Sequence, residues 1–284
     1  GPFPYEKLAN IQSNSVSGGM EAASAILYSE NSVVGDRNVR WRNVVIHEIA
    51  HQWFGNSVTE KDWDEIWLSE GFATYFTLLF IEHQYGRDEF VDGLRSSKRS
   101  VDAFYLKNPH YRLVHDNLKD MNDVTTSQIY QKGSWTLHML RGVVGTENFW
   151  KGIKLYYRQY RDSHATVADF RRVMEEVSGK DLTTFFNQWL YKPGTLKYKG
   201  NWSYDASTKQ VTIKLDQAQT DGSLFKMPIQ IAVYYPGEAK PQMQTVQADA
   251  RANFFSIKVT GEPEKVILDP DMWILMDADF KKEE

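Results

Sequence analysis

The spacing of apolar residues divides the chain into two parts with different periods. In the first part, apolar side chains recur every three or four positions, as on a helix with one buried face. The clearest run places Ile129, Gly133, Leu137, Leu140 and Val144 on one such face. Further helices are predicted over residues 40–54, 67–85, 90–107, 147–160, 166–177 and 181–191. In the helix over 147–160, we expect Phe149, Trp150, Ile153 and Tyr157 to point inward.

Polar residues spaced three apart mark possible helix starts. A hydroxyl or carboxylate at the first position and a longer polar side chain three residues later can cap the free N–H groups of a first turn. Three such pairs predict capped starts: Asp62 with Glu65, Thr125 with Gln128, and Thr166 with Asp169.

After Pro193-Gly194 the period changes to two. Val211, Ile213 and Leu215 alternate with polar residues, and residues 229–235, 257–259 and 266–268 follow the same pattern. Alternation with turn residues between the segments predicts about seven short strands in an antiparallel β-sandwich. We therefore expect an α+β chain with a mainly helical domain over residues 1–195 and a small sandwich over residues 196–284.

Composition and charge narrow the function classes. Of the 284 residues 42% are hydrophobic and 25% charged, which is ordinary for a soluble globular protein. The net charge of −4 without a basic block argues against a nucleic-acid partner. No apolar run approaches the roughly 20 residues that span a bilayer, so no membrane segment is expected. The amino terminus lacks a signal-peptide pattern, and the compartment stays unpredicted.

The chain has no cysteine, so a metal site would need nitrogen and oxygen ligands. His47-Glu48-Ile49-Ala50-His51 supplies such ligands. Residues four apart lie on one face of a helix, so both imidazoles can reach one ion, with Glu48 beside them as a general base. A catalytic zinc takes three protein ligands, and Glu70, at the start of the next predicted helix, is the candidate for the third. The alternative is that His47 and His51 are polar residues with ordinary hydrogen-bond partners on a core helix and that Glu70 is a surface charge. The whole group argues against it, because apolar neighbours bury this helix and buried charges need a partner or a metal.

These residues resemble a known family. The run His47 to Gly55, followed by Trp67-Leu68-Ser69-Glu70-Gly71-Phe72-Ala73, is similar to the aminopeptidase N family of gluzincin zinc metallopeptidases, which also contains the leukotriene hydrolase. The resemblance implies a thermolysin-like catalytic domain that removes amino-terminal residues from peptides. It also implies one bound Zn²⁺.

The resemblance extends to residues before and after the zinc motif. Gly18-Gly19-Met20-Glu21-Ala22 resembles the family's Gly-x-Met-Glu-Asn segment, whose glutamate binds the α-ammonium of the substrate. The match implies a substrate-binding role for Gly18, Gly19, Met20 and Glu21, although Ala22 stands where the family has asparagine. Tyr130, in Tyr130-Gln131-Lys132-Gly133, matches the tyrosine that hydrogen-bonds the developing oxyanion.

The expected function is therefore zinc-dependent hydrolysis of the first peptide bond in peptides that have a free amino terminus. The chain lacks the β domain that usually precedes this point in the family, and we expect it to be a fragment, a processed form or a reduced variant. A relaxed or endo-acting peptidase is thus an alternative. A leukotriene hydrolase would need an additional basic site that no residue here identifies, and an inactive binding domain is a further alternative.

Overall fold

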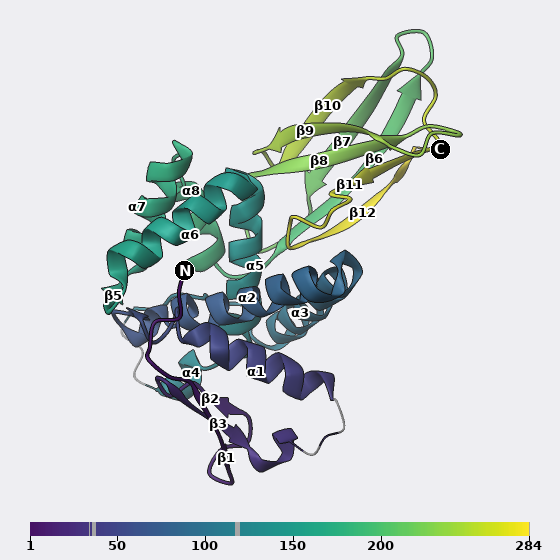
Figure 1. Ribbon diagram of the computed structural model, residues 1–284. Helices are drawn as coiled ribbons and strands as arrows, with labels where there is room; N and C mark the ends of the chain where they lie inside the picture. The colour runs from purple at the N-terminus through teal and green to yellow at the C-terminus, as the bar shows by residue number, and fades with distance from the viewer. Residues whose placement is uncertain (34, 36–37, 117–119, 284) are drawn as a thin grey trace. The chain divides into compact units, whose positions relative to one another are not determined.

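The computed structural model describes residues 1–33, 35, 38–116 and 120–283 of the chain. These residues form two compact units, Gly1–Pro193 and Gly194–Glu284. The first is mainly helical and the second is built from strands, as Figure 1 shows, so the α+β prediction is confirmed. None of the described helices is long and apolar enough to cross a membrane.

The first unit is organised around a layer of packed helices (Figure 1). Its helices are α1 (Val39–His51), α2 (Trp67–Tyr85), α3 (Arg87–Lys107), α4 (Met121–Val124), α5 (Ser127–Val144), α6 (Thr146–Tyr160), α7 (Val167–Ser178) and α8 (Thr183–Leu190), with short 3₁₀ helices at Glu30–Val33 and Trp63–Glu65. Its strands are β1 (Ala9–Ser13), β2 (Gly19–Met20), β3 (Ala25–Ser29), β4 (Val58–Glu60) and β5 (Ser163–Ala165). The first three form a sheet in the order β1-β3-β2, which leaves β2 on an edge beside α1.

The helix starts only partly follow the predicted caps. The Thr166 and Asp169 capping box is present, with both reciprocal hydrogen bonds. For α5 the cap is Thr126, whose hydroxyl accepts a hydrogen bond from the backbone N–H of Gln128 at 3.3 Å. The predicted Thr125 is therefore one residue early, because Thr126 is the last residue with extended backbone angles.

The predicted cap at Asp62 is wrong. Asp62 makes no side-chain cap hydrogen bond, and a short 3₁₀ helix separates it from α2. The Glu65 carboxylate instead accepts a hydrogen bond from the backbone N–H of Val167 at 3.2 Å. Glu65 therefore joins two segments distant in sequence, a use that no local spacing rule detects.

The core of the first unit lies where α2 and α5 pack together. All five residues of the predicted α5 face are buried. At the crossing, a Cβ atom added to Gly71 would lie 3.0 Å from the backbone of Gly133. Two glycines thus allow the two helix backbones to approach closely, and Trp67 lies beside Gly133. Trp67, Phe72 and Trp135 of these two helices have no solvent exposure.

The inward face of α6 follows its prediction at two of the four predicted residues. Phe149 and Ile153 are buried, whereas Trp150 and Tyr157 are half-buried. Tyr156 is buried instead, with 1% of its surface exposed. Positions 149, 153 and 156 follow the four-then-three spacing of one helix face, and position 157 lies farther around the helix.

The second unit has seven described strands in two sheets. They are β6 (Leu196–Asp205), β7 (Gln210–Gln217), β8 (Met227–Tyr234), β9 (Gln242–Ala248), β10 (Ala252–Lys258), β11 (Lys265–Leu268) and β12 (Met276–Lys282). The sheet orders are β10-β7-β6-β12 and β11-β8-β9. The predicted alternation is confirmed, because Val211, Ile213 and Leu215 are fully buried between exposed neighbours.

One feature of the sandwich contradicts its prediction. β12 pairs with β6 in parallel, in a register that sets Met276 opposite Leu196, so this sheet is mixed rather than antiparallel. The chain leaves β11 in one sheet and enters the edge of the other sheet as β12, running in the same direction as β6. Alternation with a period of two is the same for both strand directions and could not reveal this.

The close approach of α2 and α5 generates a stability prediction. Gly133→Ala would place a methyl group 3.1 Å from the Cα of Gly71, so we expect a loss of about 1–3 kcal/mol in the free energy of unfolding. Urea denaturation monitored by tryptophan fluorescence measures it. Gly93→Ala is the matched control, since its methyl group would meet only the end of the flexible Leu78 side chain. Equal stability of both variants would contradict the packing argument.

Candidate active site

Three side chains from α1 and α2 converge on one point. His47 and His51 lie one turn apart on α1, and Glu70 lies in the first turn of α2. The Glu70 Oε2 atom is 3.0 Å from Nε2 of His47 and 3.2 Å from Nε2 of His51. The two Nε2 atoms are 3.0 Å apart. The structure thus brings together all three residues proposed as metal ligands from the sequence, in a group that could hold a metal ion.

The contacts of His51 determine which ring nitrogen faces this point. Its Nδ1 atom lies 3.1 Å from the backbone carbonyl oxygen of Phe54 and 3.1 Å from the hydroxyl of Ser69. A carbonyl oxygen can only accept, so Nδ1 carries the hydrogen in the neutral ring. The Nε2 lone pair is then directed toward His47 and Glu70, which is the tautomer that a metal ligand requires.

The electrostatics of the cluster favour a positive charge at this point. Burial opposes ionisation of Glu70, but hydrogen bonds from the two histidines outweigh it and lower the pKa of Glu70 to about 2. Burial alone would lower the pKa of His51, yet the Glu70 carboxylate raises it to about 9. Burial lowers the pKa of His47. Two imidazoles and one ionised carboxylate are a donor set suited to zinc and similar ions.

Glu48 lies beside the cluster, against the backbone of β2. Only 6% of its surface is exposed, and burial raises the pKa of its carboxyl group to about 8. A Cβ atom added to Gly19 would collide with the Glu48 carboxylate. The second glycine of the Gly18-Gly19 pair is therefore needed for the close approach of β2 to α1.

Tyr130, from the first turn of α5, reaches the same cluster. Its hydroxyl donates a hydrogen bond to Oε1 of Glu70 at 3.1 Å, so the two oxygens of one carboxylate contact different partners. Burial and the neighbouring Glu70 raise the pKa of Tyr130 above its ordinary value. The tyrosine therefore keeps its proton and remains a hydrogen-bond donor at neutral pH.

One cleft contains most of these residues. It has a volume of about 880 Å³ and is lined by nearly all the predicted site residues, namely Gly19, Met20, Glu21, His47, Glu48, His51, Glu70 and Tyr130. Gly18 is not among the lining residues, and its carbonyl oxygen accepts a hydrogen bond from Ser29 within the small sheet. Met20 presents an exposed apolar side chain, with 47% of its surface accessible.

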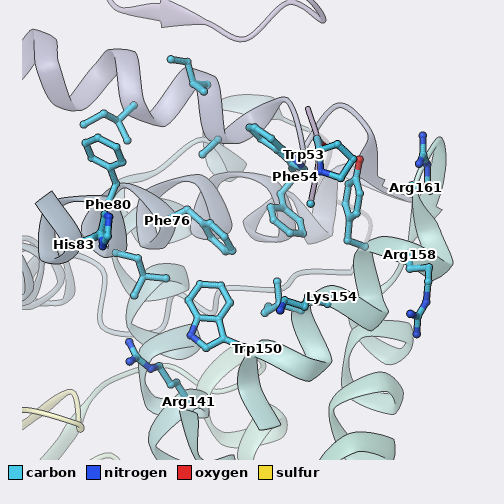
Figure 2. A pocket seen from close by; sticks show the side chains of 18 of the residues that line it. Trp53, Phe54, Phe76, Phe80, His83, Arg141, Trp150, Lys154, Arg158 and Arg161 are labelled. Carbon is cyan, nitrogen blue, oxygen red and sulfur yellow. Dashed lines mark hydrogen bonds between the residues drawn. The ribbon is translucent and has the colours of Figure 1, made fainter. Parts of the chain in front are cut away.

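A larger groove of about 990 Å³ lies along another face of α1. Figure 2 shows its aromatic lining, with Trp53 and Phe54 near the end of α1 and Trp150 on α6. None of the described residues lining this groove belongs to the predicted site. Cavity size therefore does not locate the site, whereas the convergence of titratable side chains does.

Sequence reasoning missed three supporting side chains. Ser69 contacts the outer nitrogen of His51, and the side-chain amides of Gln52 and Asn56 hydrogen-bond the backbone carbonyl oxygen of Glu21. A weak signal existed for two of them. Gln52 and Ser69 adjoin proposed ligands in the sequence, and both are polar residues within otherwise buried stretches.

The chain is similar in sequence to proteins named as aminopeptidases. The chain is 31% identical to a leucyl aminopeptidase of Saccharolobus solfataricus over 231 residues, covering 76% of this chain and 29% of that protein. It is 35% identical to an aminopeptidase N of Lactococcus lactis over 176 residues, covering 60% of this chain and 20% of that protein. The chain thus spans less than a third of the length of either relative.

The fold has a match among solved structures. A crystal structure of Legionella pneumophila aminopeptidase A in complex with aspartic acid superimposes with a TM-score of 0.82 at 20% identity, over 95% of this chain and 31% of that one. This likeness confirms the fold class. A family model described as the peptidase family M1 domain matches residues 1–189. The resemblance to the aminopeptidase N family is confirmed, and the chain belongs to peptidase family M1.

Proposed function

We propose that this chain is the catalytic part of a zinc aminopeptidase, with the first unit as the catalytic domain and the strand-built unit as a structural module. The convergence of His47, His51 and Glu70 in a cleft that also holds a buried glutamate and a tyrosine carries this proposal. The names of the relatives support it. These three residues would hold the zinc, which when bound acts as a Lewis acid that polarises a carbonyl group and makes water more acidic.

Glu48 is the proposed general base. Its position beside the cluster lets the carboxylate take a proton from the attacking water and deliver it to the leaving amine. Burial raises the pKa of its carboxyl group above the ordinary value, which makes the carboxylate a stronger base toward the attacking water. Tyr130 is the proposed donor to the oxyanion, since its protonated hydroxyl already lies at the cluster.

Glu21 is the proposed site for the α-ammonium group of the substrate. It lines the cleft with Glu48 and Glu70, so this region attracts positive charge. Opposite charges 4 Å apart interact by about 4 kcal/mol at an effective dielectric constant near 20. That gross attraction is large enough to favour a free amino terminus over a blocked one.

The edge of β2 is the proposed platform for the substrate backbone. β2 pairs with β3 on one side only, among the described strands, and Gly19 and Met20 line the cleft. An extended peptide could add to such an edge as a further strand. Gly18 would support this edge through its pairing with Ser29, and the exposed side chain of Met20 would favour apolar first residues.

The proposal predicts selective cleavage of free amino termini. We expect hydrolysis of aminoacyl p-nitroanilides of Leu, Met, Ala, Arg and Glu but not of their N-acetylated forms. A chelator should abolish the activity and added zinc restore it. Equal cleavage of free and acetylated compounds would show a relaxed or endo-acting peptidase instead of an aminopeptidase. Cleavage of neither compound by the zinc-loaded chain would refute the proposal that the active site is complete.

The proposed ligands predict about one zinc ion per chain, measured by elemental analysis after dialysis. Glu70→Gln removes the charged ligand, so we expect zinc affinity to fall by more than about tenfold. Glu82→Gln is the matched control, because Glu82 lies on the same helix but pairs with Arg87 outside the cluster. Undiminished affinity of the Glu70→Gln chain would remove Glu70 from the ligand set.

The proposed base predicts a separation between metal binding and turnover. Glu48→Gln should retain zinc and lower kcat by about 10²–10⁴-fold, since the amide cannot accept the proton. Glu60→Gln provides the control, because burial also raises the pKa of Glu60, to about 7, while Glu60 does not line the cleft. Turnover by Glu48→Gln at the wild-type rate would exclude Glu48 as the base.

A further inference from the structure

A buried amide side chain connects the proposed metal site to the segment that carries Glu21. Gln52 immediately follows His51 at the end of α1 and is fully buried. Its Oε1 atom accepts a hydrogen bond from the backbone N–H of Ser24 at 2.8 Å. Its Nε2 atom donates to the backbone carbonyl oxygen of Glu21 at 3.1 Å. The oxygen and the nitrogen of the Gln52 amide therefore both hydrogen-bond the backbone of the turn that follows Glu21.

Asn56 holds the same carbonyl oxygen from a second direction. Its Nδ2 atom donates to the backbone oxygen of Glu21 at 2.6 Å. The backbone N–H of Asn56 donates to the carbonyl oxygen of His51 at 3.0 Å. Gly55, with φ of +119°, makes the turn that brings Asn56 back, and a Cβ atom there would lie 2.9 Å from Nδ1 of His51. Asn56 thus links Glu21 to His51 through two hydrogen bonds.

We propose that Gln52 and Asn56 are positioning residues that set the distance between Glu21 and the metal ligands. This inference rests on the proposed function, in which Glu21 binds the α-ammonium and the ligands hold the metal that polarises the scissile carbonyl. An exopeptidase has to hold one charge at a fixed distance from one bond. The two amides fix Glu21 relative to the end of α1, because Gln52 directly follows His51 in the chain and Asn56 is hydrogen-bonded to the backbone of His51.

Ala22 makes these two amides more important in this chain. A methyl side chain offers no hydrogen bond, so residue 22 cannot secure its own segment. The turn retains one local backbone bond, from the N–H of Ala25 to the carbonyl oxygen of Ala22 at 2.9 Å. The bonds that connect the turn to α1 come from Gln52 and Asn56. Without them, β2 would still pair with β3, but Glu21 could shift relative to His51.

A simpler role for Gln52 would be to terminate the helix. Its Nε2 atom also lies 3.3 Å from the carbonyl oxygen of Glu48, which is an ordinary contact at a helix end. That contact is longer than either bond to the Glu21 turn. The two roles have different consequences. Loss of a contact that only terminates the helix lowers the free energy of unfolding. Loss of a positioning contact changes the selectivity between substrates.

The test measures selectivity for the position of the amino group. L-Alanine and β-alanine p-nitroanilides differ in the distance from the ammonium to the scissile carbonyl by one carbon atom. We expect the wild-type chain to prefer the α-amino compound by about 100-fold in kcat/KM, because a displacement near 1 Å costs about that much. In Gln52→Leu and Asn56→Leu this ratio should fall to about tenfold or less. The ratio is independent of the fraction of protein that is folded or loaded with zinc.

Gln217→Leu is the matched control in the second unit. Gln217 is also a buried glutamine whose Oε1 accepts from a backbone N–H, that of Phe225, and whose Nε2 donates to the carbonyl oxygen of the same residue. Its replacement should lower the melting temperature as Gln52→Leu does, while leaving the selectivity ratio unchanged. An unchanged ratio in Gln52→Leu and Asn56→Leu, with a selective wild-type chain, would overturn the positioning role alone.

A binding measurement gives a readout that needs no turnover. By calorimetry, L-leucinamide should bind the wild-type chain more tightly than N-acetyl-leucinamide, and Gln52→Leu should lose at least about tenfold of that preference. Hydrogen exchange at the Ser24 amide should also accelerate, since its acceptor is removed. A wild-type chain that shows no preference for the free amine would refute the proposed function together with this inference. A preference retained in full by Gln52→Leu would refute only the inference.

Discussion

The first unit is built around three electron-rich atoms that lie close together, the Nε2 atoms of His47 and His51 and Oε2 of Glu70. In the neutral ring of His51, Nδ1 donates to the carbonyl oxygen of Phe54, so the lone pair of Nε2 faces an ionised Glu70 carboxylate 3.2 Å away. His47 approaches both at 3.0 Å. Such a buried group is stable only with a positive charge between its members, supplied by a proton or a metal ion. The rest of the unit holds these three side chains where that charge can bind.

The packing of α2 supports this arrangement from two directions. Gly71, the residue after Glu70, allows α5 to come into backbone contact at Gly133. The same approach brings Tyr130, one turn before Gly133, to the free oxygen of Glu70. Ser69, on the other side of Glu70, contacts the outer nitrogen of His51. Three consecutive residues of α2 therefore serve as a hydroxyl contact, a proposed ligand and a packing contact.

The predictable features were those encoded by local spacing. The i,i+4 histidines, the apolar face of α5 and the alternation in β7 follow from helix and strand periods, and all are present. Some of the predictions that were wrong concern contacts between distant segments. The spacing of Glu65 from Asp62 predicts a helix cap, yet the Glu65 carboxylate contacts Val167, about a hundred residues away.

The same limit applies at the site. A motif match identifies its residues, whereas Gln52 lies within the matched run and Asn56 directly after it, and no spacing rule gives either residue a partner. Their partner is a backbone carbonyl oxygen, which every residue possesses, so no side-chain pattern marks it. The parallel pairing of β12 with β6 could not be predicted for a similar reason, since parallel and antiparallel strands have the same period of two.

The location of Gln52 and Asn56 has a mechanical consequence. A rigid sheet could hold Glu21 in place, but β2 is two residues long and pairs on one side among the described strands. Such a short edge cannot by itself fix a side chain relative to a separate helix. The hydrogen bonds from Gln52, which follows His51, and from Asn56, whose backbone is bonded to His51, remove that freedom, because any movement of the α1 terminus carries Glu21 and the proposed ligand together. The distance between them is then preserved even if the small sheet moves.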